Sequence, residues 1–146
     1  MLARARLLVA AAWAGSLWTV GYLVAPMLFS TLSDRVLAGT IAASLFHAQA
    51  LLSIACALLL LLLLWLDRAG QPGARRTTVL LTLLMLACTL VSHFGLQPEM
   101  AALRAAAGPG GVMESAARGR FGMLHGISSS LYLVQSLLAA WLVIKQ

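Results

Sequence analysis

Four long apolar stretches, separated by short polar segments, dominate the pattern of this chain. They cover residues 7–28, 37–66, 77–94 and 121–144. A helix needs roughly 20 mostly apolar residues to cross the hydrocarbon layer of a membrane, and each stretch comes close to this length or exceeds it. The first two connections are short, which favours antiparallel neighbours. The pattern therefore predicts an all-α fold, an integral membrane antiparallel four-helix bundle.

Residues 95–120 form the longest connection that the pattern predicts. We expect the third span to end before it, because Gly95 and Pro98 follow and proline cannot donate the backbone hydrogen bond that continues a helix. The segment from Pro98 to Gly108 is typical of a short helix, with proline at its start and glycine after its end. We expect this loop outside the membrane and a single transmembrane domain over residues 1–146.

The composition agrees with a membrane location, since 62% of the residues are hydrophobic and 10% are charged. A soluble domain carries about 25% charged residues, so a water-soluble fold is excluded. The formal net charge of +6 does not indicate nucleic acid, because the basic residues lie at the ends of the apolar stretches, as lipid-headgroup contacts do. The expected partner is the lipid bilayer, and nucleic acid is not expected.

The basic residues also predict an orientation, because cytoplasmic segments carry more Lys and Arg than segments on the other side. One side of the predicted bundle has six basic residues and the other has four. The six are Arg4, Arg6, Arg68, Arg75, Arg76 and Lys145, and the four are Arg35, Arg104, Arg118 and Arg120. We therefore expect both termini in the cytoplasm.

Polar residues inside the spans indicate which helix faces meet, because polar groups are costly in lipid. At 100° per residue, the fourth span has a polar stripe over three turns. The second span has a similar stripe of Thr40, Ser44 and His47, and the third span contributes His93. The candidate functional cluster consists of His47, His93, His125, Ser128, Ser129, Tyr132 and Gln135.

Packing alone explains most of these positions. Ala11 and Gly15, like Gly39 and Ala43, are small residues four apart that let two helices approach closely. Ser, Thr and Gln supply interhelical hydrogen bonds worth about 1 kcal/mol each or less. Packing explains the three histidines less well, because neutral imidazole binds metals and haem iron and titrates near physiological pH.

Three chemistries compete for the histidines. Metal or haem ligation requires two histidines that face each other at the same depth in the membrane. His47 and His125 lie at different distances into helices that start from opposite membrane faces, so the two side chains are expected to miss each other. Proton or cation transport favours an acid inside a span, and all 4 acidic residues lie outside. Hydrolysis would pair His125 with Ser128 or Ser129, but no carboxylate is nearby in sequence to orient the histidine. We therefore do not expect an enzyme and predict no cofactor, with haem or copper as the alternative.

Short motifs carry a resemblance to a known family. The most specific is Phe121-Gly-Met-Leu-His125-Gly-Ile-Ser128-Ser129, and the others are Trp13-Ala-Gly15-Ser-Leu-Trp18, Ala25-Pro26-x-Leu-Phe29 and Leu45-Phe46-His47. With these motifs nearly the whole chain resembles the small four-span bacterial membrane proteins of unknown function that group with eukaryotic transmembrane protein 205. The resemblance implies a four-helix protein of the bacterial inner membrane. Its eukaryotic member is associated with platinum-drug resistance, and the family has no established activity.

More distantly, the Trp-Gly pattern of the first span is similar to copper-resistance membrane proteins and to haem-binding membrane protoporphyrinogen oxidases. A histidine in the first span matters in those proteins, and this chain has Arg6 at the corresponding position. Eukaryotic members of the closer family have Asn where this chain has Tyr132. The metal-binding and haem-binding residues of the distant proteins are therefore not carried over.

Three functions follow as hypotheses. The first is a structural or accessory membrane component whose polar stripes pack the bundle or bind a partner membrane subunit. The second is a small transporter or efflux component for a metal ion or a cationic compound, with His47, His93 and His125 along a path through a homo-oligomer. The third is a haem- or copper-binding redox protein.

Overall fold

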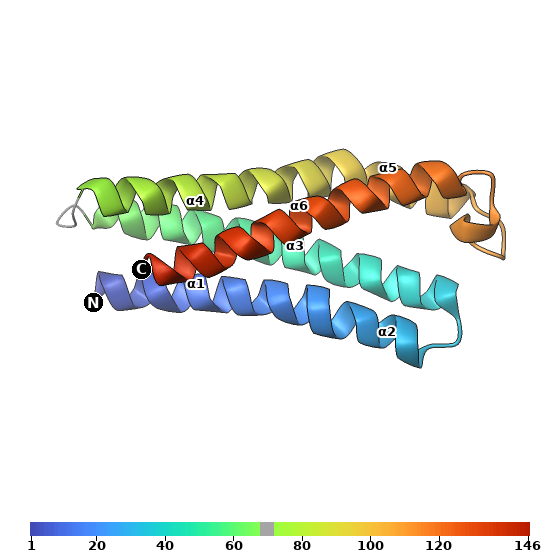
Figure 1. Ribbon diagram of the computed structural model, residues 1–146, viewed down its shortest axis with the longest axis horizontal. Coiled ribbons are helices and arrows are strands. Elements are labelled where there is room, and N and C mark those ends of the chain that lie inside the picture. Colours follow the sequence, from blue (N-terminus) through green and yellow to red (C-terminus); the bar gives the residue numbers. More distant parts are fainter. Residues whose placement is uncertain (68–71) are drawn as a thin grey trace.

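The computed structural model describes residues 1–67 and 72–146, which form four long helices joined by short connections (Figure 1). The first helix consists of α1 (Leu2–Trp18), the π-helix η1 (Thr19–Val24) and α2 (Ala25–Thr31), and the second is α3 (Arg35–Leu66). The third consists of α4 (Pro72–Leu90), the π-helix η2 (Val91–Leu96) and α5 (Gln97–Ala106), and the fourth is α6 (Arg118–Ile144). A short 3-10 helix, η3 (Val112–Glu114), precedes α6. The predicted all-α four-helix fold is confirmed.

Each of these four helices is long and apolar enough to cross a membrane. Their outward side chains include many large apolar groups: Leu8, Phe94 and Leu137 are 70%, 64% and 65% exposed. A soluble protein rarely exposes a continuous apolar surface of this extent, whereas lipid covers it without cost. The chain is therefore a membrane protein.

The helices form a ring in which each contacts two others (Figure 1). α1 packs against α3 and α6, and α4 packs against the same two helices. Both termini lie at the end of the bundle where α3 ends and α4 begins (Figure 1). At the opposite end the Asp34 carboxylate caps the second helix, because it accepts hydrogen bonds from the N–H groups of Val36 and Leu37, at 2.8 and 3.0 Å.

The buried core fills the half of the bundle nearest the termini, which we call the packed half. Its residues come from α1 and α4, which are the N-terminal parts of the first and third long helices, and from the C-terminal parts of α3 and α6. They are Ala10, Trp13, Ala14, Leu17, Cys56, Ala57, Leu60, Leu81, Met85, Ala139 and Leu142. The helices are therefore held together mainly at one end.

The predicted small-residue contacts are displaced by one position. A Cβ added to Gly15 or Gly39 would meet nothing within 4 Å, so neither glycine marks a close approach between helices. The buried small residues are instead Ala10, Ala14, Ala38 and Ala42. The predicted set and the buried set, which lies one residue earlier, both have small residues at a spacing of four. This spacing alone therefore does not tell which set is buried.

Two prolines lie inside long helices and do not end them. The third helix continues past Gly95 and Pro98 to Ala106, so the predicted helix end at Phe94 is wrong. The connection to the fourth helix therefore covers residues 107–117 and not 95–120. Pro98 stands at the start of α5, directly after η2, and Pro26 has the same place in α2 after η1. The preceding π-helix already interrupts the regular hydrogen-bond pattern, so the missing proline N–H costs little there.

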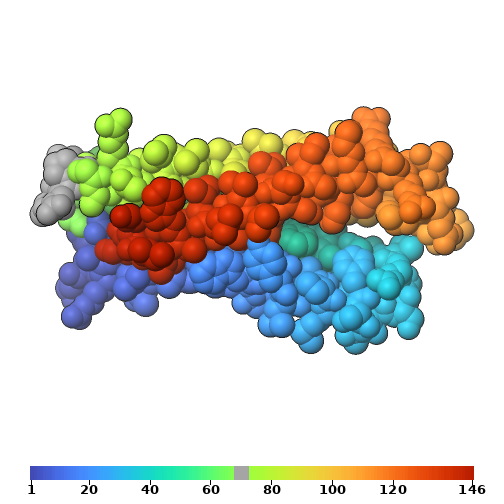
Figure 2. All heavy atoms as spheres, in the orientation of Figure 1, coloured from blue at the N-terminus to red at the C-terminus, as the bar shows by residue number. Residues whose placement is uncertain are grey.

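Beyond the two π-helices the helix pairs separate. α2 stays with α3 and α5 stays with α6, while α6 crosses the bundle from α5 to α1 (Figure 1). Figure 2 shows the resulting cleft between α6 and α2, with part of α3 visible at its floor. We call this the open half.

Candidate functional site

His47 and His93 lie side by side where α3 meets the third helix. Their ring centroids are 5.0 Å apart, with an angle of 48° between the ring planes. His47 precedes the last residue of α3 by 19 residues and His93 follows the first residue of α4 by 21, so antiparallel packing brings them to the same depth. Each lies about 5 Å from the midpoint of its helix, at 1.5 Å per residue. The pair is therefore close to the middle of the membrane-spanning part.

Local structure leaves this pair accessible for a ligand. His93 belongs to the π-helix η2, a kind of helix that is frequent at functional sites. Its ring meets the Phe94 ring edge-on at 4.7 Å, and its Nδ1 atom is buried without a hydrogen-bond partner. The His47 side chain, in contrast, is exposed. The pair thus combines an unpaired buried nitrogen with a ring that a ligand can reach.

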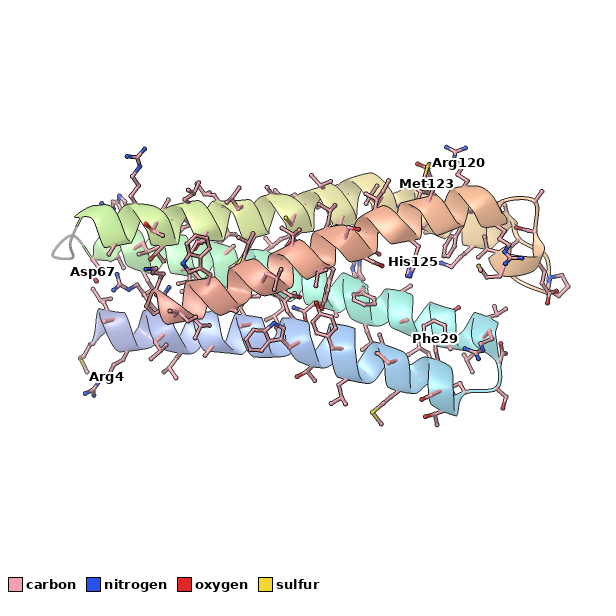
Figure 3. The ribbon with its side chains drawn as sticks, viewed as in Figure 1. Arg4, Phe29, Asp67, Arg120, Met123 and His125 are labelled. Carbon is pink, nitrogen blue, oxygen red and sulfur yellow. The ribbon has the colours of Figure 1, made fainter. Side chains whose placement is uncertain are left out.

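His125 lies apart from the other two histidines. Figure 3 shows its side chain extending from α6 into the cleft of the open half. It stacks on Phe121 of its own helix, with centroids 6.1 Å apart, and the Arg104 guanidinium lies 5.9 Å from the same Phe121 ring. The structure gives His125 no hydrogen bond to Ser128 or Ser129, so the hydrolytic pairing considered from the sequence is not formed.

Tyr132 connects α6 to the first π-helix. Its hydroxyl donates a hydrogen bond to the Leu17 carbonyl at 2.7 Å. Its ring packs edge-on against Phe46 of α3 and Tyr22 of η1, with centroids 5.4 and 6.3 Å apart. A Cβ at Gly21 would overlap the Tyr132 ring. Tyr132 therefore links three helices where the packed half meets the open half.

Two buried glutamines join neighbouring helices near mid-depth. Gln135 Nε2 donates to Thr89 Oγ1 at 2.9 Å, and Gln49 Nε2 donates to Ser16 Oγ at 3.1 Å. Sequence reasoning placed Gln135 in the candidate cluster and missed Gln49. The available signal was the residue type itself, since a glutamine in the middle of an apolar span is costly without a partner. Both residues serve interhelical bonding.

We expect Gln135→Leu to lower the free energy of unfolding by about 1 kcal/mol or less, the usual value of an interhelical hydrogen bond. The loss stays small because the Thr89 hydroxyl keeps its bond to the Met85 carbonyl at 3.1 Å. Unfolding by sodium dodecyl sulfate in mixed micelles measures the change, with the exposed Ser129→Ala as control. A loss above about 3 kcal/mol would show that Gln135 does more than pack.

The predicted polar stripes are only partly interhelical. Thr40 and Ser44 are exposed, and their hydroxyls donate to the carbonyls of Val36 and Thr40 in their own helix, at 2.9 and 3.2 Å. Ser129 is also exposed. A hydroxyl that bonds the carbonyl four residues back is satisfied without a neighbouring helix. Thr40 and Ser44 therefore satisfy their hydroxyls within α3 and do not contact a neighbouring helix through them.

The geometry of the histidine pair differs from that of two haem ligands. Within residues 1–67 and 72–146 no group of three His, Cys, Asp or Glu side chains gathers at metal-binding distance. Haem iron held by two histidines has them on opposite faces of the porphyrin, with ring centroids about 6 Å apart. The pair is closer than that, at 5.0 Å, and the cavity of about 360 Å³ that lies between α1 and α3 contains neither histidine.

Comparison with known proteins gives one match. A family model described as "Domain of unknown function (DUF4149)" matches residues 8–109, from α1 through the end of α5. No curated protein and no solved structure matches the chain. The expected similarity to transmembrane protein 205 and to copper-resistance proteins is not shown by these comparisons. His47 and His93 lie inside the matched segment, whereas His125 and Tyr132 lie outside it.

Proposed function

Since this chain belongs to the DUF4149 family, whose function is unknown, we propose a function from its own residues: it binds a transition-metal ion at His47 and His93, as a small component of metal transport or resistance in the membrane. The observation that carries the proposal is the 5.0 Å separation of the two rings. Imidazole suits Zn²⁺, copper, iron and nickel. Two imidazoles on one tetrahedral zinc ion, with bonds of about 2.0–2.1 Å, have centroids about 5 Å apart.

The site has only two histidine ligands among the described residues, which favours a metal ion that passes through the protein rather than one that stays bound. Structural zinc sites are closed by four protein ligands, whereas sites that exchange a ligand keep positions open. His47 and His93 supply two ligands, and no third His, Cys, Asp or Glu joins them among the described residues. An ion held by this pair keeps open positions for water or for a ligand from outside. Such a site releases its ion more readily than a closed one.

The orientation and location complete the proposal. Arg4, Arg6, Arg75, Arg76 and Lys145 lie at the end of the bundle that carries both termini, and Arg68 lies outside the described residues. The excess of basic residues at this end supports a cytoplasmic location of both termini. We also expect a bacterial inner membrane as the location, which is what the resemblance carried by the sequence motifs implies.

An accessory role is the second candidate function, and a groove on the outer surface favours it. The cavity of about 360 Å³ between α1 and α3 is lined by apolar residues around the Ser16–Gln49 hydrogen bond. Tightly packed membrane helices leave no such hollow, so a segment of a partner subunit suits it. This role needs no histidine.

Metal tolerance in cells separates the two roles. We expect the wild-type chain to raise the zinc or copper concentration that a metal-sensitive strain tolerates, and His47→Ala and His93→Ala to abolish this protection. His125→Ala is the matched control and should protect like the wild type, because His125 does not contact the pair. Immunoblots verify equal amounts of each variant in the membrane. If the double variant of His47 and His93 protects like the wild type, the accessory role holds.

A further inference from the structure

A small basic pocket lies at the end of the packed half, where the ends of all four helices meet. Its volume is about 100 Å³, and its lining includes Arg6 of α1, Asp67 after α3, Arg75 of α4, and Lys145 and Gln146 after α6. A pocket of this volume has room for a small anionic group such as phosphate.

Among the described residues that line this pocket, positive side chains outnumber negative ones. Arg6 Nη1 forms an ion pair with Asp67 Oδ2 at 2.9 Å, and both side chains are largely buried, at 15% and 17% exposure. Arg6 Nε is buried without a partner, while Arg75 Nε donates to the Leu64 carbonyl at 3.0 Å. Asp67 is the one carboxylate side chain among the described residues that line the pocket, whereas three cations, Arg6, Arg75 and Lys145, line it. The pocket therefore keeps an excess of positive charge.

Depth in the membrane points to the source of a compensating anion. Arg6, Arg75 and Lys145 lie about 16, 22 and 21 Å along the helix axes from the midpoints of their helices, at 1.5 Å per residue. The hydrocarbon layer reaches about 15 Å from the middle of the bilayer, so these cations are at the level of the lipid headgroups. Basic pockets between helix ends at this level bind anionic headgroups.

We propose that the pocket between Arg6, Arg75 and Lys145 binds a phosphate group, presented by an anionic phospholipid. Gln146 Oε1 is buried in the structure without a hydrogen-bond partner and can accept from a hydroxyl beside the phosphate, as in a glycerol headgroup. Free phosphate presents the same group and is the competing source.

Thermal unfolding in a nonionic detergent tests the proposal, followed by tryptophan fluorescence. Phosphatidylglycerol should raise the midpoint of the wild type by about 3–5 °C, and phosphatidylcholine at the same concentration should raise it by less than half as much. Inorganic phosphate forms a third arm. If it reproduces the shift at equal concentration, the pocket takes free phosphate; if it does not, the lipid is the ligand.

Two variants identify the pocket as the place of binding. Arg75→Gln and Lys145→Gln should each remove most of the shift in the unfolding midpoint. If Arg75→Gln does not fold, Lys145→Gln still tests the pocket, because the Lys145 side chain bonds no described residue. Arg76→Gln is the matched control, since Arg76 is exposed, lies next to Arg75 and does not line the pocket. It should keep the full shift. Equal loss in all three variants, or equal shifts with both lipids, would overturn the proposal.

Discussion

Replacing His93 by alanine is expected to weaken zinc binding by more than about hundredfold. Loss of a residue that only supports a metal ligand costs about 10–100-fold in affinity, so loss of one of two direct ligands costs at least the upper end of that range. His47→Ala should have the same effect, because the two rings contribute one ligand each at 5.0 Å. Competition with a fluorescent zinc chelator, on protein purified in detergent, measures the affinity.

His125→Ala is the control for this prediction. It removes the same chemical group from the same membrane protein, but from a place where no second histidine contacts it. Its zinc affinity should stay within about twofold of the wild type, well inside the effect expected for a ligand. If His93→Ala and His125→Ala bind zinc equally well, the histidine pair is not the site.

Gly21→Ala is expected to lower the free energy of unfolding by about 2–3 kcal/mol. The added methyl group would overlap the Tyr132 ring, and overpacking of this kind costs about 1–3 kcal/mol. It also displaces the Tyr132 hydroxyl from the Leu17 carbonyl, a further loss of about 1 kcal/mol, while the better helix propensity of alanine offsets up to about 1 kcal/mol. Unfolding by sodium dodecyl sulfate in mixed micelles gives the free energy.

Gly15→Ala provides the matched control. Both glycines lie in the first helix, but a Cβ at Gly15 meets nothing within 4 Å. This variant should be as stable as the wild type or more stable by up to about 1 kcal/mol. Equal stability of the two alanine variants would show that Tyr132 does not hold α6 against the first helix.

The fold could be predicted from the sequence because each helix that crosses a bilayer needs about 20 mostly apolar residues. The length of the apolar stretches predicted the number of long helices, which the structure confirms. The contacts inside the bundle did not follow. In the leucine run of residues 58–64 every position is chemically identical, yet packing buries Leu60 and Leu64 and leaves Leu58 and Leu62 exposed. Only the neighbouring helices decide which leucines turn inward.

The histidine pair was missed for a geometric reason. The pairing considered from the sequence was His47 with His125, but α3 and α6 lie across the bundle from each other. His47 and His93 are almost equally far along the chain from the connection between α3 and α4. In two antiparallel helices, residues at equal distances from the connection lie at the same depth, and this rule could have predicted the pair from the sequence. The π-helix η2 could not be foreseen, and it shifts the helix face beyond Leu90 relative to a regular helix.

X-ray absorption spectroscopy of the zinc-loaded protein tests the central claim most directly, because it reports the atoms bound to the metal. We predict at least two imidazole nitrogens per zinc ion, at about 2.0–2.1 Å, and loss of their signal in the double alanine variant of His47 and His93. A spectrum without imidazole, or one that this double variant leaves unchanged, would contradict the claim that the chain binds a metal ion at this pair.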